Sequence, residues 1–170
     1  GPLIGGLVAT FLEAGKAGLT DLLRRSLKWR LNIQWYAFAL GIAILLPLVP
    51  RLIGNLTGLR QARAAAATWT GPLLIGVFLW QFLTSGVGEE PGWRGYLLPF
   101  LQSRYRGSKV AWYLGIIWSV WHYPFTLYET IANMGQVPAM AAMTTLIMAL
   151  LGQTLSLIGL TFLYMWLYNQ

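Results

Sequence analysis

Charge is scarce in this sequence. Only 10% of the 170 residues are charged, against about a quarter in an ordinary soluble domain. Twelve basic and five acidic residues are too few to cover the surface of a soluble fold of this size, and 56% of the residues are apolar. The shortage argues against a cytosolic globular enzyme and indicates that lipid surrounds the chain.

Cysteine is absent, and histidine occurs once, as His122. The lack of cysteine excludes disulfides, thiolate metal ligands and a cysteine nucleophile. The formal net charge is +7, but the basic residues stand between apolar runs, as juxtamembrane anchors do. We therefore expect membrane lipids, and no nucleic acid, as partners of this positive charge.

Long apolar runs predict the fold class. We expect an all-α, polytopic transmembrane helical bundle with about 4–6 membrane helices, since about 20 apolar residues cross a bilayer. Residues 3–12 are too short to cross and are expected to be the end of a longer helix. The last run exceeds one perpendicular crossing, so it is either one tilted helix or a short helix joined to a full span. The runs expected to cross are 33–50, 70–101, 110–127 and 139–168.

The segment 13–31 has a different character, because basic residues alternate with apolar ones. Leu19, Leu23 and Leu27 recur at every fourth position, while the basic residues fall on other faces. This pattern predicts an amphipathic interfacial helix on the membrane surface, with Thr20 as its N-cap. An ordinary solvated helix is the alternative.

The distribution of Lys and Arg predicts the topology. If the runs up to residue 127 each cross once, 13–31 and 102–109 share one side of the membrane and 51–69 lies on the other. The positive-inside rule makes the more basic side cytoplasmic. The first side carries Lys16, Arg24, Arg25, Lys28, Arg30, Arg104, Arg106 and Lys109, and the second carries Arg51, Arg60 and Arg63.

Two adjacent acids, Glu89 and Glu90, interrupt the apolar run 70–101. An acid at the centre of a membrane helix costs about 3 kcal/mol on insertion scales, so such residues usually face a cavity and serve a function. Arg94 follows Glu90 by four residues, which places both on one helix face where they can pair. Glu89 lies off that face and is expected to lack a partner in its own helix.

The only histidine is expected beside these acids. Glu90 precedes Arg106 by sixteen residues and His122 follows Arg106 by sixteen. In an antiparallel helical hairpin both would lie at equal depth, roughly 24 Å along each helix. A carboxylate beside an imidazole, both desolvated, is the usual makeup of a general-base site. Trp118, one turn before His122, is expected to pack against the imidazole.

Other interpretations of these residues stay open. A transporter or proton relay would need further acids in the spans, and Glu13, Asp21 and Glu129 are expected in loops. A purely structural ion pair would lock helices together. Ser85 could be the nucleophile of a serine protease with His122 as its base, but a small helix-packing residue is the simpler interpretation.

The motifs resemble those of a known family. Residues 89–99, EEPGWRGYLLP, resemble the EExxxR motif of the CPBP family (CAAX proteases and bacteriocin-processing enzymes, also called Abi). Residues 118–124, WSVWHYP, resemble its FxxxH motif with Trp118 in place of Phe. We expect 1–170 to be a single CPBP-like intramembrane protease domain, truncated at both ends, with 86–126 as its motif-bearing core.

The resemblance implies an intramembrane endopeptidase in a bacterial or archaeal plasma membrane, acting near the cytoplasmic face. In that reading Glu89 activates a water molecule as general base, and His122 holds this water and stabilises developing charge. Glu90 and Arg94 pair and fix the local geometry. The substrate would be a peptide, a prenylated protein or another membrane protein.

The family's third motif, HxxxN, is missing, because the chain has no second histidine. Either the motif follows residue 170, or the protein is an inactive relative with an immunity or scaffold role. The missing residues would supply the oxyanion side of the site, so the chain alone is expected to be inactive or impaired. Zinc needs three protein ligands plus water, and only Glu89, Glu90 and His122 are candidates. We expect a glutamate-activated water without metal, with zinc as the alternative.

Overall fold

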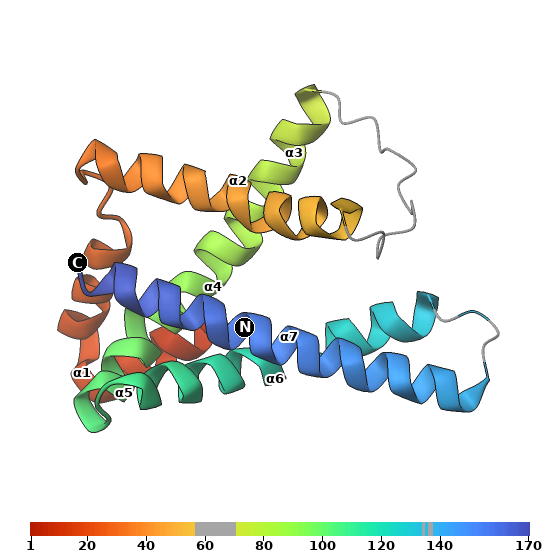
Figure 1. The fold of residues 1–170 in the computed structure, drawn as a ribbon. Helices are drawn as coiled ribbons and strands as arrows, with labels where there is room; N and C mark the ends of the chain where they lie inside the picture. The colour runs from red at the N-terminus through yellow and green to blue at the C-terminus, as the bar shows by residue number, and fades with distance from the viewer. Residues whose placement is uncertain (57–70, 134, 136–137) are drawn as a thin grey trace.

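The structure is a computed structural model that describes residues 1–56, 71–133, 135 and 138–170. Nearly every described residue is helical and none of them forms a strand, which confirms the predicted all-α class. In chain order the elements are α1 (Pro2–Ser26), α2 (Ile33–Leu56), α3 (Gly71–Gln81), the π-helical η1 (Phe82–Val87), α4 (Gly88–Glu90), the π-helical η2 (Pro91–Leu97), α5 (Leu98–Arg104), α6 (Ser108–Asn133) and α7 (Ala139–Tyr168) (Figure 1).

A kink divides α1 into two straight parts. Gly15 has φ 60° and ψ −152°, a conformation that is essentially restricted to glycine. The predicted interfacial helix over 13–31 therefore starts only after this kink, and it ends at Ser26. Thr20 lies inside the helix, and its Oγ1 donates a hydrogen bond to the Lys16 carbonyl at 3.0 Å. The prediction of Thr20 as an N-cap is wrong.

Residues 71–101 of the predicted run lie in one uninterrupted helical rod, which extends from α3 to α5. This rod passes α1 closely, because glycines of the first motif face it. A Cβ atom on Gly92 would lie 2.1 Å from the carbonyl oxygen of Pro2, and one on Gly95 would lie 2.5 Å from Cδ1 of the fully buried Leu22. The backbone contact at Gly92 requires glycine, and a side chain at position 95 would displace Leu22, so the motif also encodes the docking surface for α1.

A side chain of α1 also fills a gap in the hydrogen bonding of the rod. Pro99 has no N–H to donate to the carbonyl of Gly95, four residues earlier. Nη1 of Arg25 donates to this carbonyl at 3.3 Å, while Nε of the same guanidinium donates to Asp21 at 2.8 Å. One arginine therefore ties the second half of α1 to the motif-bearing rod.

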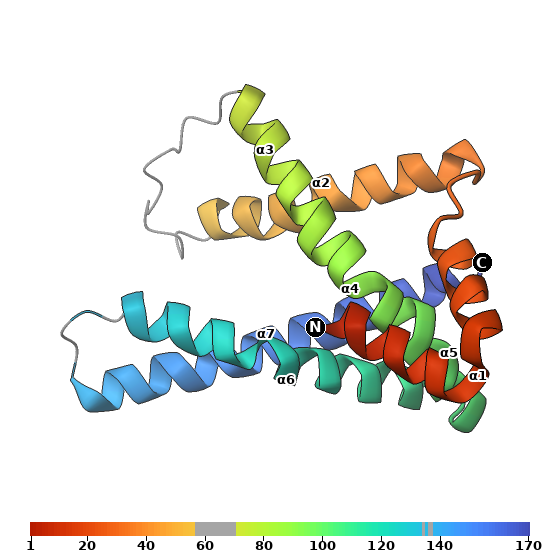
Figure 2. The same ribbon diagram turned by 180° about the vertical axis from the view of Figure 1, so that it is seen from behind.

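Helices α6 and α7 form an antiparallel pair that runs across the molecule (Figures 1 and 2). Gly115 permits their close approach, since a Cβ there would lie 2.7 Å from Cα of Ile158. Polar contacts also join the pair: Tyr123 Oη lies 2.9 Å from Thr154 Oγ1. α7 is one continuous helix, so it is not a short helix joined to a separate span.

The buried core lies where the rod meets α6. Its members come from η2, α5 and α6, and side chains of α7 pack against it. Short connections favour this arrangement, because α5 ends at Arg104 and α6 begins at Ser108. The core residues are Trp93, Leu98, Leu101, Val110, Leu114 and Trp118.

Helix α2 lies above α7 in both views, whereas α6 crosses α7 (Figures 1 and 2). Trp35 and Phe38 of α2 contact Trp166 near the end of α7, with ring centroids 6.2 and 5.6 Å apart. Large apolar side chains elsewhere on α2 are exposed. They need lipid or protein as surroundings.

Among the described helices, α1 and α7 are long and apolar enough to cross a membrane. The predicted runs 33–50 and 110–127 are helical as α2 and α6, while the expected number of about 4–6 membrane helices stays a prediction. The acids expected in loops lie instead on helices, where all three are exposed: Glu13 and Asp21 on α1, and Glu129 on α6. Arg60 and Arg63 of the predicted topology lie outside the described residues.

Candidate active site

The two adjacent acids lie where the helical rod changes its hydrogen-bonding pattern. Glu89 and Glu90 form the short α4 between the two π-helical segments. π-helical turns are rare and occur frequently at functional sites. Pro91 opens η2 and has no N–H for the carbonyl four residues earlier, which favours a departure from regular α-helix at this point.

Glu89 accepts hydrogen bonds from two helices. Its Oε2 lies 3.1 Å from Nε1 of Trp93 in the same rod, and 3.4 Å from Nε1 of Trp118 on α6. The prediction that Glu89 lacks a partner in its own helix is therefore wrong, because an indole N–H four residues later is a donor. The side chain of Glu89 is 18% exposed, so the carboxylate is enclosed but reachable.

His122 faces the same carboxylate oxygen. Its Nε2 lies 4.0 Å from Oε2 of Glu89, and the equal spacing around the basic turn predicts this proximity. Nδ1 lies 2.9 Å from the Trp118 carbonyl. Since a carbonyl only accepts, Nδ1 carries a proton, and Nε2 is the ring nitrogen that faces Glu89. The Trp118 and His122 rings meet at a centroid distance of 5.9 Å, as expected.

The distance between the two side chains suits one shared water molecule. A water that donates one hydrogen to each of two acceptors holds them about 4.4 Å apart when each hydrogen bond is about 2.8 Å long. The separation of Glu89 Oε2 and His122 Nε2 is 4.0 Å. A water bound in this way keeps its oxygen lone pairs free for an electrophile.

Glu90 and Arg94 form the predicted pair. Nη1 of Arg94 lies 3.0 Å from Oε1 of Glu90, and the Arg94 side chain is only 11% exposed. The guanidinium lies between two aromatic rings, since its Cζ is 4.2 Å from the ring centroid of Trp118 and 4.5 Å from that of Tyr164. Such cation–π contacts stabilise a guanidinium that is shielded from water.

Tyr164 is the residue of this site that the sequence analysis missed. It lies on α7, within a run that predicts only a membrane span. Its ring covers Arg94 and lies 6.0 Å from that of Trp118. No motif marks Tyr164, and only the packing of α7 on α6 brings it here.

Ser85 takes no part in this arrangement. It is exposed on η1. No hydrogen bond between the described side chains joins it to His122, so the base that a serine nucleophile needs is not in place.

The described residues do not assemble a zinc site by themselves. A structural or catalytic zinc ion takes at least three protein ligands. Within the described parts of the chain, no three His, Cys, Asp or Glu side chains come close enough to share a metal ion. Glu90, the third candidate ligand, has an oxygen bound to Arg94 instead.

The fold and the site define a class of protein. It is an apolar helical protein in which a carboxylate and an imidazole from different helices lie 4.0 Å apart. The family described as Type II CAAX prenyl endopeptidase Rce1-like matches residues 70–170, which is more than half of the chain and includes both motifs. The chain belongs to this family, and the predicted resemblance to CPBP proteins is confirmed.

One similar curated protein is the CAAX prenyl protease 2 of Methanococcus maripaludis. It is 48% identical over 46 residues, which cover 27% of this chain. The match spans 17% of the length of that relative. No solved structure matches the chain.

Proposed function

We propose that this chain carries the water-activating residues of an intramembrane endopeptidase of the CAAX-protease type. The observation that supports this most directly is the separation of 4.0 Å between Glu89 Oε2 and His122 Nε2, which suits a water shared by both. Membership of a CAAX prenyl endopeptidase family supports peptide-bond hydrolysis. The neighbouring indole donors orient Glu89 so that one oxygen faces His122.

In the proposed reaction Glu89 acts as general base. The water oxygen attacks the peptide carbonyl carbon while one of its protons passes to the Glu89 carboxylate. His122 accepts a hydrogen bond from the water through Nε2 and stabilises the partial positive charge that develops on the water oxygen during the attack. When the C–N bond breaks, the proton on Glu89 passes to the leaving amine, and the products are a carboxylic acid and an amine. No step requires a metal ion.

Glu90 and Arg94 act as positioning residues in this mechanism. Their ion pair is one residue further along the rod than the hydrogen bond between Trp93 and Glu89. The rings of Trp118 and Tyr164 cover its guanidinium. A rigid neighbour of this kind limits the rotamers of a catalytic side chain. Loss of the pair would leave the reacting groups present but less well oriented.

We propose that the protein is multi-pass, with cleavage near the cytoplasmic face and a peptide, a prenylated protein or another membrane protein as substrate. The apolar length of α7 supports membrane insertion. The archaeal relative, named CAAX prenyl protease 2, supports a prenylated substrate class and a prokaryotic membrane.

Substitution of the two reacting side chains tests the proposal. The natural protein that carries this chain is reconstituted in liposomes, and cleavage of a fluorogenic prenylated CAAX peptide is followed. Glu89→Gln and His122→Ala should each lower kcat/KM by about 100-fold or more, the usual range for loss of acid–base catalysis. Glu129→Gln makes the same chemical change at an exposed position of α6 and should leave the rate within about twofold, in line with a surface change away from the reacting groups.

Wild-type cleavage by Glu89→Gln or His122→Ala would contradict the assignment. No cleavage by the wild-type protein of prenylated, leader or membrane-protein peptides would favour an inactive relative with an immunity or scaffold role.

Metal dependence is tested separately with a chelator. Because the described residues do not assemble three ligands, prolonged dialysis against 1,10-phenanthroline should leave the cleavage rate unchanged. A lost activity that returns when zinc alone is added would overturn the metal-free mechanism and restore the zinc alternative.

A further inference from the structure

The chain turns sharply after α1, and a basic depression lies at the C-terminal end of this helix. The depression has a volume of about 450 Å³ and lies outside the site of Glu89 and His122. We call it the basic pocket; its lining residues are Arg24, Arg25, Leu27, Lys28, Trp29 and Arg30.

Most of the charge in the basic pocket is not neutralised by the protein. Arg25 is paired with Asp21 at 2.8 Å. Arg24, Lys28 and Arg30 are exposed, and none of them is paired with a carboxylate in the described structure. Three cations around one depression repel each other, so an anion between them would be stabilised.

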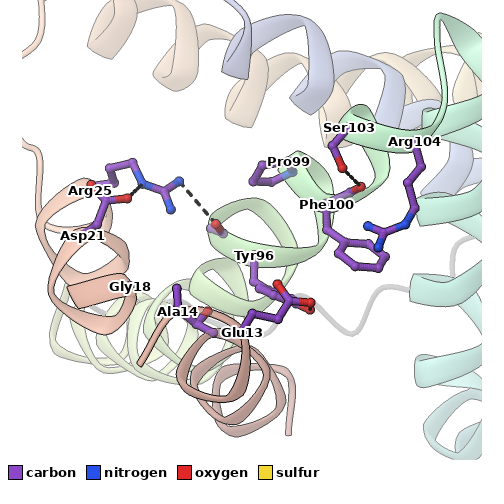
Figure 3. A pocket seen from close by; sticks show the side chains of 12 residues that line it. Glu13, Ala14, Gly18, Asp21, Arg25, Tyr96, Pro99, Phe100, Ser103 and Arg104 are labelled. Carbon is purple, nitrogen blue, oxygen red and sulfur yellow. Dashed lines mark hydrogen bonds and ion pairs between the residues drawn. The ribbon is translucent and has the colours of Figure 1, made fainter. Parts of the chain in front are cut away.

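The adjacent depression differs, because three of its four charged side chains, Glu13, Asp21 and Arg25, have polar partners within it. This cavity of about 380 Å³ lies between α1 and the rod (Figure 3). Within it Tyr96 donates to Glu13 at 2.9 Å, and Arg25 binds both Asp21 and the Gly95 carbonyl. The basic pocket therefore differs from this cavity in bringing three cations without a carboxylate partner together around one depression.

Exposed apolar side chains accompany these cations. Leu27 and Trp29 line the pocket and are 74% and 70% exposed. The guanidinium of Arg30 lies over the Trp29 ring, 5.3 Å from its centroid. Trp near a basic cluster is typical of a membrane interface, where the ring lies at the level of the headgroups. A free phosphate ion would use the cations but leave the apolar side chains in water.

We propose that the basic pocket binds the phosphate of an anionic phospholipid. The guanidinium groups of Arg24 and Arg30 suit two-pronged contacts with phosphate oxygens, and Lys28 adds a point charge. Leu27 and Trp29 contact the glycerol and the upper acyl chains. The bound lipid lies beside Arg25, which connects α1 to the motif-bearing rod. Lipid binding here does not require that the protein be a protease.

Lipid titration tests this site. The purified natural protein in detergent is titrated with short-chain phosphatidylglycerol, phosphatidylcholine and inorganic phosphate, and binding is measured by native mass spectrometry. The triple variant R24A/K28A/R30A should bind phosphatidylglycerol about 100-fold more weakly, since each basic residue near an anionic surface contributes roughly a factor of five. Phosphatidylcholine and inorganic phosphate should bind the wild-type protein much more weakly than phosphatidylglycerol does.

A matched triple variant removes the same charge elsewhere. Lys16, Arg106 and Lys109 are exposed and lie outside the basic pocket, so K16A/R106A/K109A should keep most of the affinity. Equal losses in both triple variants, or equal binding of the two lipids, would overturn the site. Tight binding of inorganic phosphate would overturn its assignment to lipid. The single variant Lys28→Ala, outside α1, repeats the test if the triple variant does not fold.

Discussion

Arg94 is held mainly by aromatic faces. Its Nε and Nη2 are buried without a hydrogen-bond partner in the described structure, whereas Trp118 and Tyr164 cover the guanidinium. Leaving buried N–H groups without acceptors is unfavourable, so the rings and Glu90 must hold the charge in place. In the proposed mechanism, Tyr164 therefore positions Glu90 through Arg94.

Replacement of Tyr164 should separate positioning from substrate binding. Tyr164→Leu should lower kcat about tenfold with KM nearly unchanged, because a shielded cation–π contact of about 2 kcal/mol is lost and no substrate contact is removed. Tyr164→Phe keeps the ring and should remain close to wild type. Steady-state cleavage kinetics in liposomes measure both constants, with Tyr168→Leu as the control one turn further along α7.

A rise in KM at constant kcat would instead place Tyr164 against the substrate. Equal activities of Tyr164→Phe and Tyr164→Leu would show that the ring has no positioning role.

At the residue scale, the sequence predicts much of the site. Motif spacing indicates the pairing of Glu90 with Arg94, and counting from the basic turn indicates that His122 lies beside the acids. Two features escape this reasoning. Trp93 is expected close to the site, but the motif spacing does not indicate that its indole N–H donates to Glu89. Tyr164 depends on the register between two helices, which local patterns do not encode.

At the scale of elements, glycine contacts set how closely helices approach. Gly115→Ala should destabilise the α6–α7 pair by about 1–3 kcal/mol, because the new methyl group meets the backbone of Ile158 in a packed interface. Gly152→Ala on α7 has open space and should be neutral or stabilising by about 0.5–1 kcal/mol through helix propensity. Thermal unfolding of the two variants in detergent compares them, and a lower midpoint for Gly152→Ala than for Gly115→Ala would contradict the packing explanation.

The first helix shows why element boundaries are hard to predict. Leucine periodicity correctly indicates a helical face near Leu23, but it carries no information on the kink at Gly15 or on the end at Ser26. A glycine inside a helical pattern is usually tolerated without a bend. The kink separates two parts of α1 that both contact the rod. Pro2 meets Gly92 before the kink, and Leu22 meets Gly95 after it, so the path of α1 depends on these long-range contacts.

At the scale of the whole molecule, the lack of cysteine makes topology measurable. Each introduced cysteine is the only thiol in the chain. In the proposed multi-pass arrangement, Ser26→Cys and Ser103→Cys should react with a membrane-impermeant maleimide from the cytoplasmic side, and Met140→Cys from the opposite side. Labelling of intact cells and of inverted vesicles distinguishes the two sides of the membrane. Reaction of all three cysteines from one side would contradict the predicted crossing by α6.

The overall arrangement is only partly predictable for a physical reason. A short basic turn brings consecutive helices together, so the meeting of the rod with α6 follows from chain connectivity. The contact of α2 with α7 joins Trp35 to Trp166 across most of the sequence. Apolar helices offer many equivalent faces for such distant contacts, and composition does not choose among them.

The paired indoles at Glu89 have an optical consequence. Trp93 and Trp118 both donate to the same carboxylate oxygen, so the emission of these two fluorophores is coupled to the charge on that oxygen. Protonation or displacement of Glu89 during turnover would change the emission of both tryptophans at once. Variants that keep only these two of the nine tryptophans would carry a built-in spectroscopic signal of the state of Glu89, without any attached dye.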